Sequence, residues 1–417
     1  MTSADRVIRR SVPLPWGVKD RLRQQPVLQS LWASYRNRQV LVEYRRRRER
    51  YAALATVGSV VYSQGQTLAA ARERLAKRGY IPPGRARGEV HTFAVFPSYE
   101  WHTQLLPDLR ELGRVTHFDY EAIGYSVEEF TRRDARATAR RAKMMQGVLP
   151  ALRRAHVERP VDWVFFYGGG QDIDPRIVQA ITEELGVPVV NMSLDDKQGW
   201  AGASAGRWRT GAVDITSSFD LYMTSARVAC EWHMVEGGRP IYLPPGFNAS
   251  THAPGSGRPD IPVSFVGAAY GFRFAVERHL RAHRVDFHPF GAGWPAGRVE
   301  DAVAIFNRSA INLGMGGIEY SEELTNVKGR DFEIPGTGGG VYLTSFNPDL
   351  AQHFLVGDEI LCYRNRDEMV ELIRYYLARP EEAAAIASRA RERSLREHRW
   401  LHRYETMLRT LGILSAP

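Results

Sequence analysis

The sequence has little cysteine and no long hydrophobic run. Its two cysteines, Cys230 and Cys362, lie far apart in a chain of 417 residues. This count excludes a disulfide framework and a cysteine-rich zinc site, and it favours a reducing, cytoplasmic setting. No apolar stretch approaches the roughly 20 residues that span a bilayer. Residues 1–18 also lack the continuous apolar segment of a secretory signal, so we expect a cytoplasmic protein.

Internal repeats and low-complexity tracts are also missing. Hydrophobic residues make up 44% of the chain and aromatic residues 11%, values typical of a globular rather than a disordered protein. A chain of 417 residues is too long for one ordinary hydrophobic core. We therefore expect two domains and an extension.

Positive charge is concentrated at one end of the chain. Residues 1–88 contain 19 Lys and Arg against 5 Asp and Glu, a net charge of +14, whereas the remainder has a net charge of −5. The richest segment, residues 45–50, contains five arginines and one glutamate. Such a segment suits anionic lipid headgroups, a phosphorylated acceptor or nucleic acid, but a solvated helix face is an equally good interpretation. We expect a peripheral membrane contact and no specific nucleic acid.

The spacing of apolar residues predicts alternating strands and helices. Helices are expected over 20–55 and 66–79, and an α/β series begins at Val90. A second series begins at Val263, after the proline-rich residues 244–260. Its strands are expected near 262–267, 285–289, 310–313, 340–344 and 359–363. Its helices are expected near 271–283, 299–308, 322–333, 347–354 and 366–378, with terminal helices over 380–412.

This alternation predicts an α/β fold of two Rossmann-type, doubly wound domains that face each other across a cleft. We divide the chain into a basic helical extension (1–88), an N-terminal acceptor-side domain (89–245), a C-terminal donor domain (246–397) and a helix that crosses back (398–417). Ligands of such folds bind at the carboxyl ends of the strands. Periplasmic binding proteins and some epimerases share this plan, so architecture alone does not choose a function.

Residues 326–344, Asn-Val-Lys-Gly-Arg-Asp-Phe-Glu-Ile-Pro-Gly-Thr-Gly-Gly-Gly-Val-Tyr-Leu-Thr, are the most informative stretch. They predict a helix that ends before Pro335, a glycine-rich loop and a buried strand. Lys328 and Arg330 suit a diphosphate, and Glu333 suits sugar hydroxyls. The stretch therefore suggests a nucleotide-sugar site, although glycine-rich connections of this kind also occur where nothing binds.

Residues 262–412 resemble a known family. The matching features are Val263–Gly267 with Arg273, Gly291-Ala292-Gly293-Trp294, Ile311-Asn312-Leu313, residues 328–333, Gly338-Gly339, Leu343-Thr344, residues 357–360, Tyr375-Tyr376-Leu377, Pro380-Glu381, Glu397-His398 and Arg403. In order and spacing they resemble the CgeB-type branch of the GT-B glycosyltransferases, the spore-coat maturation family.

The resemblance implies a sugar transferase that uses a nucleotide-sugar donor and an unidentified acceptor. The acceptor class stays open among small molecules, glycans, lipids and proteins. Glu333 matches the glutamate that holds the donor ribose. The implied donor-binding residues are Gly267, Arg273, Lys328, Arg330, Glu333, Gly336, Gly338 and Gly339.

Catalytic candidates lie on the N-terminal side of the cleft. Asp195 and Asp196 follow a predicted strand, where a carboxylate would orient or deprotonate the acceptor hydroxyl. A helix N-cap or a solvated turn is the alternative interpretation. His102 follows the first strand of this domain and is a candidate base or an ordinary surface histidine.

One departure from the family bears on stereochemistry. Many retaining GT-B enzymes carry two glutamates eight positions apart, but Thr325 lies eight positions before Glu333. Glu319, Glu322 and Glu323 are possible substitutes, so retention and inversion both stay open.

No metal or other cofactor is expected. The only Asp-x-Asp sequence considered, Asp172-Ile173-Asp174, precedes Pro175 and predicts a helix start. His279, His283 and His288 have a spacing that suggests a metal site, but we expect them to be structural.

Two other functions compete with sugar transfer. A catalytically silent nucleotide- or sugar-binding protein on the same fold would account for the missing glutamate. A module that docks through its basic arm on membranes or nucleic acid, with the α/β body as a scaffold, would account for residues 1–88.

Overall fold

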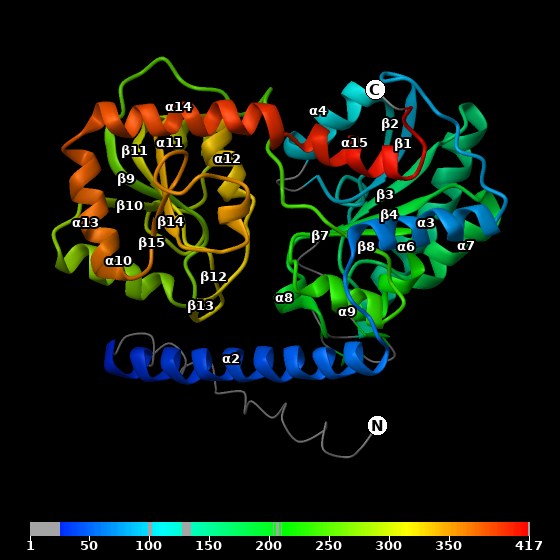
Figure 1. The fold of residues 1–417 in the computed structure, drawn as a ribbon, viewed down its shortest axis with the longest axis horizontal. Helices are drawn as coiled ribbons and strands as arrows, with labels where there is room; N and C mark the ends of the chain where they lie inside the picture. The colour runs from blue at the N-terminus through cyan, green and yellow to red at the C-terminus, as the bar shows by residue number, and fades with distance from the viewer. Residues whose placement is uncertain are drawn as a thin grey trace.

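The computed structural model describes residues 26–98, 102–126, 135–202, 204–205, 208–209 and 211–415. They form two α/β halves, each built on a parallel sheet, with one long helix lying beneath both (Figure 1). This confirms the α/β fold of two doubly wound domains with a helical N-terminal region. Among the described residues, no helix has the length and apolar character needed to cross a bilayer.

The first sheet has the strand order β2-β1-β3-β4-β7-β8, and all its pairings are parallel. Its strands are β1 (Val90–Val95), β2 (Gly113–Phe118), β3 (Trp163–Tyr167), β4 (Val189–Ser193), β7 (Leu221–Thr224) and β8 (Pro240–Tyr242). The central strands are apolar and buried because helices cover both faces. The direction of winding reverses between β1 and β3.

Two hydrophobic cores lie on the two faces of this sheet. One face is covered by α6 (Ala135–Glu158), α7 (Pro175–Leu185) and α9 (Ala229–Val235). The other is covered by α3 (Gln64–Lys77), α4 (His102–Leu112) and the last helix, α15 (Trp400–Thr410). The shorter elements are α8 (Asp196–Gly199), β5 (Ser204–Ala205), β6 (Trp208–Arg209), η2 (Ala212–Asp214) and η3 (Thr216–Ser218).

The second sheet has the strand order β10-β9-β11-β14-β15 and is also parallel. Its strands are β9 (Ile261–Val266), β10 (Phe287–Phe290), β11 (Ser309–Leu313), β14 (Val341–Ser345) and β15 (Leu361–Tyr363). The helices are α10 (Arg273–Ala282), α11 (Ala302–Arg308), α12 (Arg330–Thr337), η4 (Leu350–Gln352), α13 (Arg366–Leu377) and α14 (Pro380–Glu397). The winding reverses between β9 and β11.

Three expectations in this second series are wrong. Residues 322–333 are not one helix, because β12 (Gly317–Ile318) and β13 (Ser321–Thr325) form an antiparallel hairpin and α12 begins only at Arg330. Pro335 does not end a helix, since α12 continues to Thr337 and ends at Gly338 in the left-handed conformation. Residues 347–354 contain only the single turn η4.

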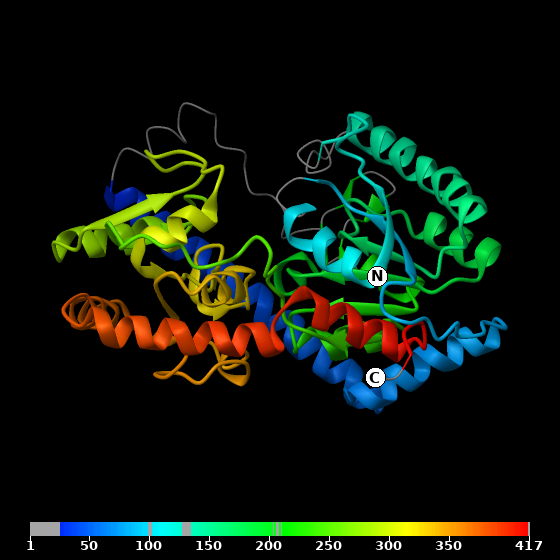
Figure 2. The ribbon, with the colours of Figure 1, turned by 90° about the horizontal axis from the view of Figure 1, so that it is seen from above.

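The chain crosses between the halves at two adjacent places. Phe247 N donates to His398 O at 3.0 Å, and Trp400 N donates to Phe247 O at 3.1 Å, so the two crossings are hydrogen-bonded to each other. Arg403 is buried over them and donates to the carbonyl oxygens of Pro244 and Glu397. Figure 2 shows α14 leading directly into α15 between the halves.

The described part of the N-terminal region, residues 26–88, is packed against both halves. Its long helix, α2 (Pro26–Val57), runs beneath the whole width of the molecule (Figure 1). Near one end, the Arg36 guanidinium lies 5.7 Å from the centre of the Tyr320 ring, in the turn between β12 and β13. Near the other, the buried Tyr51 packs between Trp200 and Trp232.

Candidate functional site

The two reversals of winding identify where a ligand would lie. In open parallel sheets the crevice outside the carboxyl ends of the strands opens at the reversal. In the second sheet this point is flanked by the loop after β9, residues 267–272, and by Gly314 after β11. In the first sheet it is flanked by residues after β1 and β3. Several of the residues expected to bind the donor lie at the reversal in the second sheet.

Three of them, Gly267, Arg273 and Arg330, are brought together by the structure. Arg273 is the first residue of α10 and Arg330 the first residue of α12. Their guanidinium carbons lie 5.0 and 5.7 Å from the centre of the Phe265 ring. A Cβ atom on Gly267 would lie 3.2 Å from an Arg330 nitrogen. Two helices that start 57 positions apart therefore place two cations beside one glycine at the carboxyl end of β9.

Of these two arginines, Arg273 has a guanidinium group that is largely shielded from water. Arg273 is buried; its Nη1 donates to Ala268 O at 2.7 Å and its guanidinium stacks 4.1 Å from the centre of the Tyr270 ring. Burial lowers the pKa of Arg273 to about 10, Tyr270 opposes this shift and Arg330 adds to it. The side chain still carries its charge at neutral pH. Arg273 Nε makes no hydrogen bond to the described residues, which leaves a donor for a ligand oxygen.

Lys328 and Asp195 meet across the two halves. Lys328 Nζ lies 3.3 Å from Asp195 Oδ1, which joins the loop before α12 to the loop after β4. Beside this pair, Asn326 Nδ2 donates to Leu194 O at 2.8 Å. The loop after β4 of the first sheet therefore faces the segment between β13 and α12 of the second half.

Sequence reasoning missed Lys197, which ties the same loops together. Its ammonium group is buried and donates to Thr325 O at 2.9 Å and to Asp349 Oδ2 at 3.3 Å. Burial lowers the pKa of Lys197, and Asp349 partly compensates. A cation directly after the Asp195-Asp196 pair was the available signal. Asp349 follows β14, and nothing in the surrounding sequence indicated that it would pair with Lys197.

Asp196 does not face an acceptor. Its carboxylate is buried, accepts a hydrogen bond from Ser193 Oγ at 2.7 Å and lies 3.1 Å from His233 Nε2. Burial favours a raised pKa, but His233 and the hydrogen bonds outweigh it and the pKa of Asp196 is lowered. The structure therefore gives Asp196 an internal role and leaves Asp195, whose side chain is 57% exposed, as the accessible member of the pair.

His102 is not in a loop, since it is the first residue of α4. Its side chain lies outside the described part of the chain. Its prediction as a base therefore stays a prediction.

The glycines of α12 and its end are explained by packing. A Cβ atom on Gly336 would lie 2.3 Å from the Phe247 ring, and one on Gly338 would lie 2.8 Å from the Arg391 side chain. On Gly339 it would lie 2.4 Å from Asn307 Oδ1. Protein atoms fill the space beside these three glycines. Packing therefore accounts for glycine at these three positions, and their role in donor binding stays a prediction.

Glu333 lies in the first turn of α12, half-buried and close to Gly329. Two of the glutamates considered as substitutes at the missing position are engaged elsewhere, because Glu322 pairs with Arg366 and Glu319 lies 4.0 Å from Arg36. Glu323 is exposed on β13. The donor-side role of Glu333 stays a prediction.

Two histidines, the buried His398 and the half-buried His353, lie where the chain crosses between the halves. His398 Nε2 donates to His353 O at 3.0 Å, and Arg403 lies 3.1 Å from His398 Nδ1. Burial, together with the Arg403 charge, lowers the pKa of His398 to about 3 and that of His353 to about 4. Both rings are therefore neutral at physiological pH, and Arg403 is the fixed charge at the crossing.

The predicted helix start at Asp174 is confirmed, because its carboxylate accepts a hydrogen bond from Arg176 N and caps α7. Asp172 instead accepts from Gly169 N at 3.2 Å. His288 pairs with Asp286 and lies apart from the other two histidines. In the part of the chain that the structure describes, the group suited to a metal ion is His279, His283 and Asp367.

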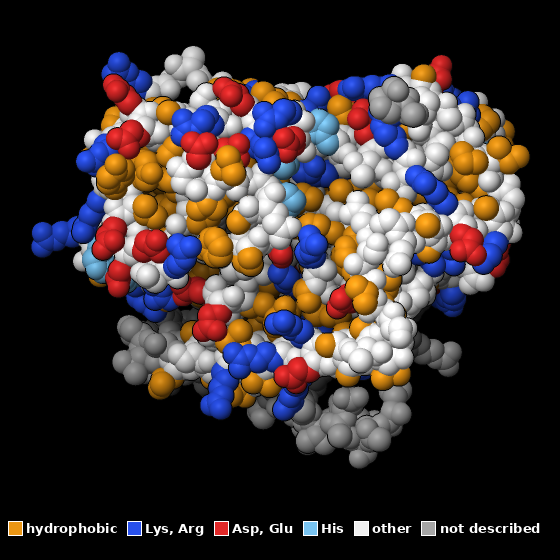
Figure 3. All heavy atoms as spheres, in the orientation of Figure 1, with side chains coloured by type: hydrophobic (Ala, Val, Ile, Leu, Met, Phe, Trp, Pro, Cys, Tyr) orange, Lys and Arg blue, Asp and Glu red, His pale blue; other side chains and the backbone are white. Residues whose placement is uncertain are grey.

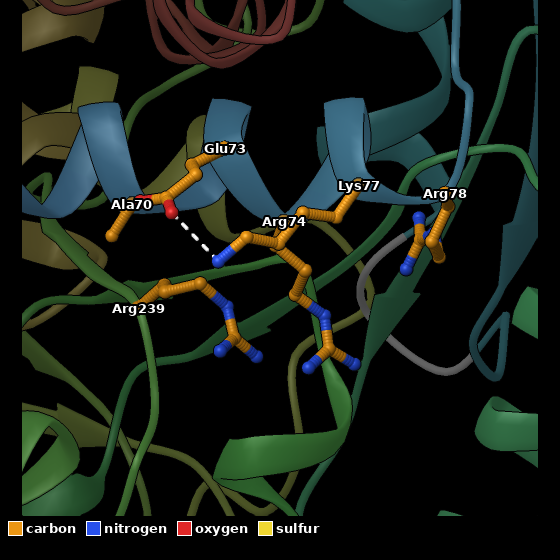
Figure 4. A pocket seen from close by; sticks show the side chains of 6 residues that line it. All are labelled: Ala70, Glu73, Arg74, Lys77, Arg78 and Arg239. Carbon is orange, nitrogen blue, oxygen red and sulfur yellow. Dashed lines mark ion pairs between the residues drawn. The ribbon is translucent and has the colours of Figure 1, made fainter.

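A hollow of about 460 Å³ lies away from the cleft, between α3 and the end of β8 (Figure 4). It is lined by Ala70, Glu73, Arg74, Lys77, Arg78 and Arg239. Arg74 and Arg78 bind the buried Asp220, and Arg239 donates to four backbone carbonyls. These arginines are engaged in contacts within the protein, so this hollow is not the candidate site.

Comparisons with known proteins agree with this geometry. Residues 272–409 match the model of the glycosyl transferase-like family. Sucrose-phosphate synthase from Thermosynechococcus elongatus is similar with a TM-score of 0.50 and 12% identity, over 84% of this chain and 94% of that one. Anabaena HepE, solved in complex with UDP and glucose, is similar with a TM-score of 0.51 and 12% identity, over 78% and 100%. No curated protein matched. The chain therefore has the GT-B fold, and its residues 272–409 match the glycosyl transferase-like family.

Proposed function

We propose that this protein is a glycosyltransferase that moves a sugar from a nucleoside-diphosphate sugar to an acceptor hydroxyl. The observation that carries the proposal is the convergence of Arg273 and Arg330 on Gly267, at the carboxyl end of β9. Breaking the sugar–phosphate bond builds negative charge on the departing diphosphate. Preorganised cations in a poorly solvated site stabilise that charge in the transition state.

The two sides of the cleft would have different roles. The second half would hold the donor, with Arg273 and Arg330 at the diphosphate and Glu333 at the ribose. Asp195 faces the second half from the first and is our candidate to orient or deprotonate the acceptor. Its contact with Lys328 would have to open or shift when the donor enters. We place the protein nearest the CgeB-type branch, as a hexosyltransferase whose acceptor is unidentified.

Thermal stabilisation by UDP, GDP, dTDP, ADP and CDP tests the donor site. We expect UDP to stabilise the protein, because the neighbour HepE was solved with UDP and glucose. A nucleotide at 100 times its Kd adds about 2.7 kcal/mol to the free energy of unfolding. Glu333→Ala should lose this shift, whereas Glu371→Ala, an exposed change on α13, should keep it. No shift with any nucleotide in folded wild-type protein would contradict the proposal.

A second candidate is a catalytically silent nucleotide- or sugar-binding protein on the same fold. The observation in its favour is Thr325 in place of the first glutamate, with its carbonyl bound to Lys197. Release of labelled sugar from the donor separates the two candidates. Nucleotide binding without transfer or hydrolysis would favour the silent protein.

We also propose that transfer needs no catalytic metal. Arg273 and Arg330 supply two positive charges at the place where a divalent ion would otherwise neutralise the diphosphate. Turnover should therefore persist without added Mg²⁺ or Mn²⁺. A strict requirement for one Mn²⁺ per protein would contradict this.

The outer surface of α2 supports the proposal that this protein binds to an anionic membrane surface. Leu31, Trp32 and Tyr35 are exposed there, and Figure 3 shows Lys and Arg side chains along the edge that α2 forms. Aromatic side chains and arginines on one exposed helix suit the boundary between headgroups and acyl chains. Sedimentation with phosphatidylglycerol vesicles, and not with phosphatidylcholine vesicles, is the expected result.

A further inference from the structure

His279 of α10, His283 directly after the end of α10 and Asp367 of α13 form a cluster on the second half of the molecule. His279 and His283 are one helical turn apart, and their ring centres are 4.3 Å apart. Asp367 lies in the first turn of α13, which packs beside α10. The cluster joins two helices that are 84 residues apart in sequence, counted from His283 to Asp367, so sequence spacing gave no sign of the third residue.

The distances in the cluster suit a small divalent ion. His279 Nε2 lies 3.2 Å from Asp367 Oδ1, and the ligand atoms of all three residues lie within 4.8 Å of one another. A tetrahedral zinc ion with bonds of about 2.0–2.1 Å holds its ligand atoms about 3.3 Å apart. The His279–Asp367 distance is close to this value, and the ligand atom of His283 lies within 4.8 Å of the other two.

Hydrogen bonding orients the two imidazoles as metal ligands. His283 Nδ1 lies 2.9 Å from His279 O. A carbonyl oxygen only accepts, so His283 Nδ1 carries the proton and its Nε2 presents a lone pair. His279 Nε2 is buried and forms no well-directed hydrogen bond to a described residue, although Asp367 is close. Both nitrogens are therefore suited to bind a cation.

An ordinary ion pair explains the cluster less well. Asp367 is 79% exposed, and an exposed pair of this kind contributes little to stability. The neighbouring cations do not occupy the carboxylate: Arg281 pairs with Glu277, and Arg374 donates to His283 O. These contacts leave Asp367 available to a metal.

We propose that His279, His283 and Asp367 bind one zinc ion, with water at the fourth position. Borderline-soft zinc suits two imidazoles and a carboxylate, whereas magnesium prefers oxygen ligands. The ion would lie apart from the proposed sugar-transfer site. It would fasten the last turn of α10 to α13, and α10 is the helix whose first residue is Arg273. The proposal does not depend on the proposed function.

Zinc titration of untagged, chelator-treated protein tests this proposal, read by calorimetry and by thermal unfolding. Wild-type protein should bind one zinc ion and show a raised Tm. His283→Ala and Asp367→Asn should each weaken binding by at least tenfold. The matched control is His288→Ala, which removes a histidine of the same sequence cluster that pairs with Asp286 and should bind zinc as the wild type does.

Two results would overturn the proposal. One is wild-type protein that binds no zinc in a chelator-free buffer, and the other is His283→Ala protein that binds zinc as tightly as the wild type. Circular dichroism of the metal-free variants separates lost binding from lost folding. The visible absorption of Co²⁺ in place of zinc gives an independent readout, since a tetrahedral site is expected in the wild type and none in His283→Ala.

Discussion

Arg273 and Arg330 approach the same phenylalanine ring from the first residues of two different helices. The sequence places Arg273 near the start of a predicted helix and Arg330 inside the predicted helix 322–333, and only the fold brings the starts of α10 and α12 to the same strand end. Burial removes water that would otherwise screen their charge, so the pair interacts strongly with any anion that enters. The cost is mainly desolvation, to which repulsion by Arg330 adds, and both lower the pKa of Arg273.

Replacing Arg330 with alanine should lower kcat by about 10²–10³, the usual effect of losing one transition-state donor. We choose Arg330 because Arg273 is buried and its loss would also disturb the fold. The matched control, Arg389→Ala, removes an exposed arginine of α14 and should leave kcat unchanged. A fall in kcat of less than threefold for Arg330→Ala would remove this residue from the mechanism.

The two histidines at the crossing, His398 and His353, make stability depend on pH in a defined direction. The pKa of His398 is lowered to about 3 and that of His353 to about 4, from an ordinary value of 6.5. On acidification the unfolded chain therefore takes up protons first, so this stability is complete above pH 6.5 and is lost as the pH falls from 6.5 towards 4. The loss is at most about 1.4 kcal/mol per pH unit for each histidine.

Urea unfolding at pH 7.5, 6.5 and 5.5 measures this slope. The midpoint should change little between the first two values and fall at the third. His398→Gln should make the fall shallower. A midpoint that is the same at pH 5.5 and 7.5 would show that these rings are not kept neutral by the fold.

Single residues show where sequence reasoning succeeds and where it stops. Lys328 and Asp195 were both singled out, and they meet across the cleft because each follows a strand end on the facing side. Asp196 has the same sequence context as Asp195, but His233, 37 residues later, closes over it. Exposure of a carboxylate depends on such long-range packing, so the sequence alone does not separate the two.

Helix α12 shows how a local rule is overridden at the scale of an element. Proline removes one helical hydrogen bond and glycine weakens a helix, so Pro335-Gly336 predicts a loop. The helix nevertheless continues for two residues, because buried Phe332, Ile334 and Phe247 pack around it. The hairpin strand β13 was misread for a related reason, since Ser-Glu-Glu-Leu-Thr is compatible with a helix and only pairing with β12 makes it a strand.

Gly336→Ala tests whether packing explains this glycine. Alanine improves helix propensity by about 1 kcal/mol, but its Cβ would lie 2.3 Å from the buried Phe247 ring. Overpacking of this kind costs about 1–3 kcal/mol, so we expect a lower free energy of unfolding. Gly257→Ala is the control, because a Cβ there meets nothing within 4 Å. Equal stability of the two variants would leave Gly336 without a packing explanation.

Helix α2 was predicted, but its docking was not. Apolar and charged residues occur on both its inner and its outer side, so its sequence does not show which side is covered. Hydrogen exchange can show it. Tyr51→Ala should speed amide exchange over residues 36–57, because Tyr51 packs against Trp200 and Trp232.

The control for this exchange experiment is Tyr35→Ala on the exposed side of the same helix. We expect it to leave amide exchange at wild-type rates. Equal acceleration by both variants would mean that helix propensity, and not docking, protects α2.

At the scale of the molecule, the strand and helix alternation was enough to predict two parallel sheets and a cleft. It did not show that three segments link the halves: the two crossings and α2. It also suggested that the basic region is a detachable arm. The structure corrects this, because Tyr51, Ala71 and Leu75 belong to the cores of the first half.

Truncation after Arg393 should abolish folding of the first half. The cut removes Trp400, Tyr404 and Met407, which are buried in the core over α4. Each large core residue contributes about 2–5 kcal/mol, so the loss of all three is comparable to the total stability of a typical domain. Solubility and circular dichroism measure the outcome, with a chain ending at Ser415 as the control. A soluble truncated protein with wild-type ellipticity would contradict this assignment.

The place of α15 has a consequence for biosynthesis. A ribosome releases the chain from its amino end, so every strand of the first sheet emerges long before Trp400 to Leu414, which complete one of its faces. The second sheet is made entirely within that interval. The second half can therefore fold while one apolar face of the first sheet is still uncovered. A nascent chain in this interval needs protection from aggregation.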